Sequence, residues 1–194
     1  MTVLAAVTAG VLLGYLAGGR LGNLGSADLR DGWLLGAAAV INALDGYLPA
    51  LDAWARAQGI PLLVVSYEVI GVWAARNIKA GPSQVRMPLA VGSAGAACNA
   101  AVIAANGRMP VILPPRWASG LYPGGAVLDA KHVVMTSHAV LPWLGDIFPL
   151  VGGAVMFSFG DVLLAIGFAE LMAVLMIADP HRNQRMWARG VNLE

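Results

Sequence analysis

The sequence predicts an all-α membrane protein, a polytopic bundle of about five transmembrane helices that forms a single domain over residues 1–194. Hydrophobic residues make up 58% of the chain and charged residues only 12%, and the mean hydropathy is +0.70. A soluble domain carries roughly 25% charged residues, so this chain has too few charges to cover a water-facing surface. Its apolar residues also form separate runs, each near the ~20 residues that a helix needs to cross a bilayer. Lipid is therefore the expected solvent.

The first two spans are expected at residues 3–19 and 32–54. The first ends at Gly18-Gly19-Arg20. No basic residue precedes its apolar core, so we expect a retained span rather than a cleaved signal. The second is interrupted by acidic residues and a proline, namely Asp45, Pro49 and Asp52, and is still predicted as one span.

The third and fourth spans are expected at residues 60–76 and 87–107. Glu68 stands at the middle of the third span. The fourth has no charged residue between Arg86 and Arg108, a length sufficient to cross ~30 Å of hydrocarbon as a helix. Its glycines, Gly92 and Gly95, are expected to let a neighbouring helix approach closely.

The fifth span is expected at residues 153–177, after a Pro- and Gly-rich outer loop at residues 108–152. This span contains Asp161 and Glu170 and stops before a proline, which cannot continue a helix. A loop of such length without regular structure is usually functional or disordered, and the aromatic residues here favour an ordered one. Its part at residues 138–153 can form a re-entrant turn, provided that other protein covers its backbone polar groups.

The basic residues predict the orientation. Five spans put the two chain ends on opposite sides of the membrane. An outside N-terminus places eight of the 12 basic residues in the cytoplasm: Arg20, Arg30, Arg76, Lys79, Arg86, Arg182, Arg185 and Arg189. The positive-inside rule favours this arrangement. We therefore expect a cytoplasmic C-terminus, with the basic tail at residues 181–187 on the inner membrane surface.

This topology gathers polar residues on the outer side of the membrane. A charge inside a span costs roughly 2.5–3.5 kcal/mol on insertion scales, so it usually faces protein or water. The candidate substrate-binding pocket comprises Asp45, Asn106, Arg108, His138, Asp146 and Asp161. In one interpretation Arg108 binds an anionic head group through its forked donors. In that interpretation His138 also forms an acid–base pair with Asp146 or Asp161. In the other, which we favour, Arg108 pairs with one of these aspartates and ties the loop to the bundle.

Two intramembrane glutamates lie apart from this pocket. Glu68 at mid-membrane is expected to be a hydrogen-bonded structural residue, and the alternative is a proton or ion relay. Glu170 follows Asp161 by nine residues, which is about 180° around a helix. The two side chains therefore point to opposite sides, and one pocket cannot hold both.

Several classes of chemistry are not expected. A net charge of +1 argues against nucleic acid, and the single cysteine, Cys98, cannot form an internal disulfide. No zinc-protease, nucleophile-elbow, Walker or Rossmann motif is present. We therefore predict no cofactor and no metal site, although His132 and His138 stand near two aspartates.

Three short motifs resemble a bacterial family of small multispan membrane proteins. They are NGRMPV at residues 106–111, LPWLGDIFP at residues 141–149 and FSFGDVL at residues 157–163. That family is catalogued as a domain of unknown function. The resemblance implies a protein of the bacterial cytoplasmic membrane with a loop before its last helix, and it implies no activity. Arg108, Asp146 and Asp161 lie within the motifs.

The predicted function is that of a non-enzymatic binding or accessory component, such as a small subunit of a larger membrane assembly. The chain shows no recognisable nucleophile, and its aqueous parts are too small for a soluble active domain. The alternative is a membrane enzyme or transporter that acts on a lipid-like or small anionic substrate through the outer pocket. The expected partners are the lipid bilayer and either another membrane protein or a second copy of the chain.

Overall fold

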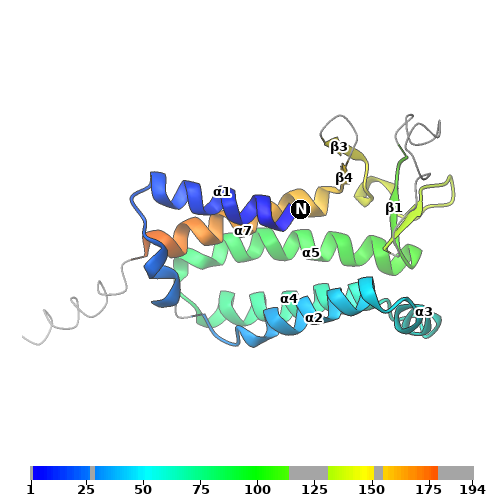
Figure 1. Ribbon diagram of the computed structural model, residues 1–194, viewed down its shortest axis with the longest axis horizontal. Helices are drawn as coiled ribbons and strands as arrows, with labels where there is room; N and C mark the ends of the chain where they lie inside the picture. The colour runs from blue at the N-terminus through cyan, green and yellow to red at the C-terminus, as the bar shows by residue number, and fades with distance from the viewer. Residues whose placement is uncertain (1, 27–28, 114–130, 151–154, 179–194) are drawn as a thin grey trace, which may run out of the picture.

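The computed structural model describes residues 2–26, 29–113, 131–150 and 155–178, and these residues are mostly helical (Figure 1). The α-helices are α1 (Thr2–Leu16), α2 (Trp33–Tyr47), α3 (Pro49–Ala57), α4 (Leu62–Ala80), α5 (Arg86–Asn106) and α7 (Phe159–Ile177). Short 3₁₀ turns occupy Leu21–Ser26, Ser83–Val85 and Pro142–Leu144. The expected helical fold class is therefore confirmed for the bundle.

Five helices lie side by side in the order α1, α7, α5, α4, α2, each packed against the next. Glycines allow the closest approaches. A Cβ atom on Gly95 of α5 would lie 2.5 Å from the Gly160 carbonyl oxygen of α7, and one on Gly167 would lie 2.5 Å from the Gly92 nitrogen. The expected role in close packing is thus confirmed for Gly95, whereas a Cβ atom on Gly92 would lie at an ordinary contact distance of 3.9 Å from the Gly167 Cα atom. α1 and α2 stand at the two ends of this row, yet residues of both line the same cavity. The row of helices is therefore curved.

A substitution at this glycine contact tests the packing. Gly95→Ala is expected to lower the free energy of unfolding by about 1–3 kcal/mol, because the added methyl group forces α5 and α7 apart. Gly71→Ala is the matched control, since a Cβ atom there meets nothing within 4 Å. The free energy of unfolding of this control is expected to rise by about 0.5–1 kcal/mol, because alanine makes the unfolded chain less flexible than glycine does. Thermal unfolding in detergent measures both, and equal stabilities of the two variants would contradict the packing.

The predicted second span does not form one helix. α2 ends at Tyr47, and α3 begins at Pro49 after a bend of 101°. Proline lacks a backbone N–H and excludes the helical conformation from the residue before it, here Leu48 with φ −121° and ψ 74°. The segment at residues 32–54 is therefore sharply bent rather than one straight helix, and α3 lies across the end of the bundle (Figure 1).

Among the described residues, two helical segments are long and apolar enough to cross a membrane, Ser83–Asn106 and Phe159–Ile177. The bent pair α2 and α3 makes a third if it counts as one span. The expected number of five spans and the re-entrant turn are not confirmed by this criterion. α4 runs four residues beyond the predicted end at residue 76, and α7 starts at residue 159 rather than 153. The basic tail at residues 181–187 lies outside the described residues.

Short strands in the loop were not predicted. β1 (Met109–Val111) pairs in parallel with β2 (His132–Val134), and β3 (Phe148–Leu150) pairs antiparallel with β4 (Val155–Phe157). Met109, Pro110 and Val111 are buried, so their backbone groups need partners other than water. The backbone next to β2 supplies two of those partners, because Met109 N donates to the Lys131 carbonyl at 3.0 Å and the Val111 carbonyl accepts from Met135 N at 2.9 Å. The Pro110 carbonyl accepts from Asp146 N at 2.8 Å, and the all-α prediction does not hold for the loop.

Two hydrophobic clusters hold the two ends of the bundle. One joins the start of α2 and α5 to the ends of α4 and α7 through Leu34, Trp73, Leu89 and Leu171. The other joins the start of α4 to the end of α5 through Leu63, Val102, Ile103 and Met109, beside the strands. We call these ends the turn end and the strand end. The candidate site lies between them.

Candidate functional site

A cavity of about 460 Å³ lies inside the curled row of helices. Its wall is mainly apolar, with Leu35, Ile70, Leu164 and Phe168, and four alanines leave the space open: Ala6, Ala38, Ala39 and Ala165. Four polar side chains reach the wall: Asn42, Ser66, Tyr67 and Asp161. Ligand pockets in proteins have this size and this mixture of apolar walls with few polar groups.

The directions of the helices make the cavity polar at one end. α2 runs toward the strand end, so Asn42 lies closer to that end than Leu35. α4 and α7 run away from it, so Tyr67 and Asp161 also lie near the strand end. Ile70 and Phe168 follow them deeper in the bundle. The cavity is therefore amphipathic along the bundle axis.

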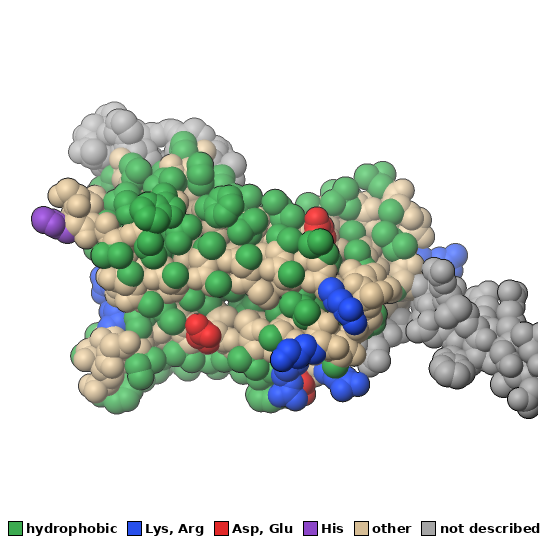
Figure 2. Space-filling model, turned by 180° about the vertical axis from the view of Figure 1, so that it is seen from behind, with side chains coloured by type: hydrophobic (Ala, Val, Ile, Leu, Met, Phe, Trp, Pro, Cys, Tyr) green, Lys and Arg blue, Asp and Glu red, His purple; other side chains and the backbone are tan. Residues whose placement is uncertain are grey.

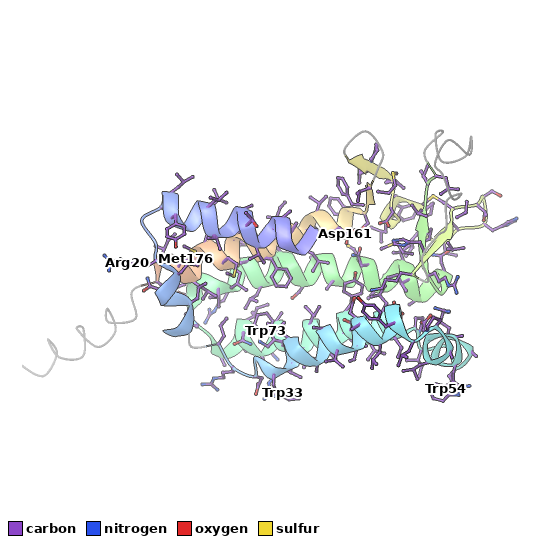
Figure 3. The ribbon with its side chains drawn as sticks, viewed as in Figure 1. Arg20, Trp33, Trp54, Trp73, Asp161 and Met176 are labelled. Carbon is purple, nitrogen blue, oxygen red and sulfur yellow. The ribbon has the colours of Figure 1, made fainter. Side chains whose placement is uncertain are left out.

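Asp161 is held in place by the start of its own helix. The Ser158 hydroxyl accepts a hydrogen bond from the Asp161 backbone nitrogen at 3.0 Å, and the Asp161 carboxylate accepts one from the Ser158 nitrogen at 3.1 Å. This reciprocal capping box satisfies two backbone donors that the first turn of a helix leaves open. It also orients the carboxylate at the cavity wall (Figure 3).

Asn99 of α5 connects Asp161 with two other polar side chains. Its amide nitrogen donates to Asp161 Oδ1 at 2.8 Å and to Tyr67 Oη at 3.2 Å. Its amide oxygen accepts a hydrogen bond from the Ser158 hydroxyl at 2.9 Å. Asn99 and Ser158 are both fully buried, with 0% exposure. One amide therefore ties α4, α5 and α7 together behind the cavity.

A second polar group, the charge cluster, lies at the strand end. Asp52 of α3 forms an ion pair with Arg56, and Lys131 donates to Asn42 Oδ1 at 2.7 Å and lies 3.8 Å from Asp45. The four charged residues of this group, together with Arg108, line a cavity of about 10 Å³, which has room for about one water molecule. Burial, and next the positive charge of Arg108, lower the pKa of Arg56, while Asp45 opposes them.

A comparison with protein-family models gives a match over residues 26–173 to a family of unknown function, DUF5317. The chain belongs to this family. No curated protein and no solved structure matches the chain. The DUF5317 match includes all four polar residues of the cavity wall, Asn42, Ser66, Tyr67 and Asp161, together with the charge cluster. It begins after α1, which adds only Ala6 to the wall.

The structure divides the residues of the predicted outer pocket of this DUF5317 protein between two cavities and the loop. Asp161 lies at the large cavity, whereas Asp45 and Arg108 lie at the charge cluster. Within the described residues, no ion pair joins Arg108 to Asp161. In the favoured interpretation, Arg108 ties the loop to the bundle. In the structure Lys131 has this role, through its contacts with Asn42 and Asp45.

The remaining predicted residues fasten the loop. Asn106 exchanges two hydrogen bonds with the Val140 backbone, at 2.8 and 2.9 Å. Asp146 pairs with His132 at 3.1 Å rather than with His138, which is exposed. The proposed acid–base pair with His138 therefore has no support from this geometry. Among the described residues, no group of three or more His, Cys, Asp or Glu side chains could hold a metal ion.

Sequence reasoning missed the partners of Asp161. In the sequence, Asn99 is a polar residue in an apolar span, where such side chains hydrogen-bond between helices, but Tyr67 and Ser158 give no polarity signal of their own. The one available signal was the spacing Ser158-Phe159-Gly160-Asp161, the pattern of a capping box before an apolar run. Spacing along one helix cannot show which residues of α4 and α5 face that box.

Proposed function

We propose that this DUF5317 protein is a non-enzymatic binding protein of the bacterial cytoplasmic membrane, whose cavity holds an amphipathic molecule with a hydrogen-bond-donor head group. The single observation behind this proposal is the 460 Å³ cavity, which is polar at Asp161 and apolar at Phe168.

Exposed aromatic residues support five membrane-crossing helices. Tyr15 and Trp33, 51% and 69% exposed, lie at the turn end, and Tyr47, Trp54 and Trp143 lie at the strand end with exposures of 62–84%. Figure 3 marks Trp33 and Trp54 near the opposite ends of the α2–α3 pair. Tyrosine and tryptophan concentrate at both membrane–water interfaces. Between these belts, hydrophobic side chains such as Leu13, Val40 and Ile166 are exposed on the helices.

The distribution of basic residues supports an outside N-terminus. Five basic residues lie next to helix ends at the turn end: Arg20, Arg30, Arg76, Lys79 and Arg86. By the positive-inside rule, this end is the cytoplasmic one. The strand end then faces outward. Its described basic residues are Arg56, Arg108 and Lys131, and two of these form ion pairs with aspartates. The cavity consequently opens its polar end toward the outer half of the bilayer.

The polar groups of the cavity define the head group. Asp161 presents carboxylate oxygens, and the Ser66 hydroxyl is already engaged with the Ala38 carbonyl at 3.0 Å. A carboxylate repels an anionic head group and accepts hydrogen bonds from a hydroxyl or amine. Asp161 and Phe168 are seven residues apart on α7, so about 10 Å of apolar wall lies below the head group. A hydroxyl- or amine-headed amphiphile fits this shape better than the anionic substrate considered from the sequence.

The hydrogen bonds that hold Asp161 support a non-enzymatic role. Both carboxylate oxygens already accept hydrogen bonds, Oδ1 from Asn99 and Oδ2 from the Ser158 backbone. General acid–base catalysis needs a second titratable group within reach of the same substrate atom. On the described wall, the other polar side chains are Asn42, Ser66 and Tyr67. This set recognises a head group and lacks a partner for proton transfer near neutral pH.

The charge cluster favours a second candidate, an enzyme or transporter for a small anionic substrate. Three basic residues, Arg56, Arg108 and Lys131, stand there against two acidic ones, Asp45 and Asp52. A phosphate or carboxylate would find forked guanidinium donors. The space of about 10 Å³ holds a water molecule but no such group, so the cluster would have to open first.

Mass spectrometry of bound lipids tests the proposed function. The protein is purified in mild detergent from native membranes, and co-purifying molecules are extracted and quantified. We expect one neutral or amine-headed amphiphile near stoichiometric amounts, and at least about a tenfold loss in Ala165→Phe, which fills the cavity. Ala43→Phe is the control, because Ala43 is exposed on α2 and does not line the cavity. Enrichment of an anionic lipid, or equal ligand content in all three proteins, would overturn the proposal.

A further inference from the structure

Two glutamates stand exposed on the outside of the bundle rather than inside it. Glu68 shares the outer stripe of α4 with Val72 and Ala75, whereas the inner stripe of that helix is buried through Ser66, Trp73 and Asn77. Glu170 is exposed on α7 next to Ile166. Seen from behind, the molecule shows single acidic side chains among hydrophobic and small ones (Figure 2).

Both glutamates lie away from the helix ends. Glu68 is six residues after the start of α4, about 9 Å along the axis, and twelve residues, about 18 Å, before its end. Glu170 is eleven residues after the start of α7, about 16 Å. Among the described residues, neither carboxylate has a hydrogen bond or ion pair. An acidic side chain facing hydrocarbon costs roughly 2.5–3.5 kcal/mol, and such residues almost always face protein or water.

The surface between the two glutamates is covered by small side chains. α5 lies between α4 and α7, and its outward residues are the exposed alanines Ala90, Ala94, Ala97, Ala101 and Ala104. Their spacing of four and three residues keeps them on one helix face. Small side chains let a neighbouring transmembrane helix approach closely. We call this surface of α4, α5 and α7 the outer face.

The charge of the outer face decides what covers it. Two copies of one membrane protein share an orientation, so a second copy presents its own residues at the same depths. The exposed basic residues of α4 and α5 are Arg76, Lys79 and Arg86, at the turn end, and Glu68 lies toward the strand end. A second copy would therefore bring a glutamate, and no cation, to the level of Glu68. The complementary occupant is a different protein with a basic residue at that depth.

We propose that the outer face is the docking surface for a transmembrane helix of another membrane protein, which carries a lysine or arginine at the depth of Glu68. The alanines of α5 form the floor, and Glu68 accepts the cation. Glu170 gives a second acceptor on the other side of the floor, nearer the turn end. This interaction rests on the membrane placement of the helices and is independent of the cavity ligand.

A peptide association assay tests the charge complementarity directly. The full-length protein is reconstituted in phosphatidylcholine vesicles with a fluorescent leucine–alanine helix of about 21 residues, and association is measured by energy transfer. One peptide carries a lysine at the depth of Glu68, and the control peptide carries a leucine at the same position. We expect the lysine peptide to bind about three- to tenfold more tightly, and Glu68→Gln to remove that difference. Ala97→Phe should weaken the binding of both peptides, whereas Ala43→Phe should leave the binding of both unchanged.

Equal binding of the two peptides, or an unchanged preference in Glu68→Gln, would overturn the proposal. A second measurement in cells uses a photo-cross-linking residue at position 97. Cross-links to an apolar helix with a basic residue, lost in Glu68→Gln, support the docking surface. Cross-links only to a second copy of the chain overturn it. Lipid content of Glu68→Gln should equal that of the wild type, which separates this test from that of the cavity.

Discussion

Replacing Asn99 with alanine is expected to lower the free energy of unfolding by about 3 kcal/mol, with loss of the cavity ligand. Each buried polar group left without a partner costs about 1–3 kcal/mol, and Asn99 serves Tyr67, Ser158 and Asp161. Asp161 would also lose the donor that holds its Oδ1. Chemical unfolding of the purified protein in detergent measures the stability, and lipid extraction measures the ligand.

Asn106→Ala is the control for this substitution. Asn106 lies at the exposed end of α5, where it binds the Val140 backbone. Water can replace those hydrogen bonds, so the expected loss is only about 0.5–1.5 kcal/mol. If Asn99→Ala proved as stable as Asn106→Ala, Asn99 would not be the connection between the three helices.

The second large effect concerns Arg56. Its ion pair with Asp52 is buried, with side-chain exposures of 18% and 1%. Arg56→Ala would leave the Asp52 charge buried without that partner, and breaking such pairs costs about 3–5 kcal/mol. The variant should therefore unfold at markedly lower denaturant concentration than the wild type. The double variant Asp52→Leu/Arg56→Leu should recover most of the loss, because no charge then remains to be paired.

The exposed pair of Arg76 and Asp31 supplies the comparison. Its N–O distance is 2.7 Å, and its side chains are 61% and 27% exposed. Surface pairs contribute about 0–1 kcal/mol, so Arg76→Ala should change the stability little. A loss in Arg56→Ala no larger than in Arg76→Ala would show that water reaches Asp52 and that this pair contributes no more stability than an exposed one.

These two predictions concern the supports of the proposed binding site. Asn99 of α5 holds the polar end of the cavity in place through its hydrogen bonds to Tyr67 of α4 and to Asp161 of α7. Asp52 and Arg56 form an ion pair within α3 and line the small cavity at the strand end together with Lys131. A site on packed helices needs such hydrogen-bonded supports, because a head group is recognised only when its acceptors stay in place.

Much of the bundle could be predicted from apolar runs. The helices α1, α4, α5 and α7 lie within a few residues of the expected positions, because a helix in an apolar environment must satisfy its backbone hydrogen bonds within itself. The break at Pro49 was underestimated, since a proline kinks a span in one context and ends it in another. The strands of the loop escaped detection because each has only three residues, too few for an alternating pattern.

The candidate site was predicted only in part. Asp161 was recognised from the cost of a charge in a span, and it does line the cavity. Arg108, Asp146 and His138 were grouped with it because all were assigned to the outer side. Depth in the membrane fixes one coordinate of a residue, whereas a pocket also requires that the helices bring its members to the same side. His132 rather than His138 therefore meets Asp146.

By itself, the sequence determined where the apolar helices lie and which charged residues interrupt them. These properties depend on composition and on local backbone chemistry, which neighbours along the chain define. Only the tertiary structure decided that Asn99 joins Tyr67 to Asp161 and that Glu68 faces outward. A helix can rotate about its axis without changing its apolar length, so the packing of α4, α5 and α7 against one another sets which side chains become a site and which a surface.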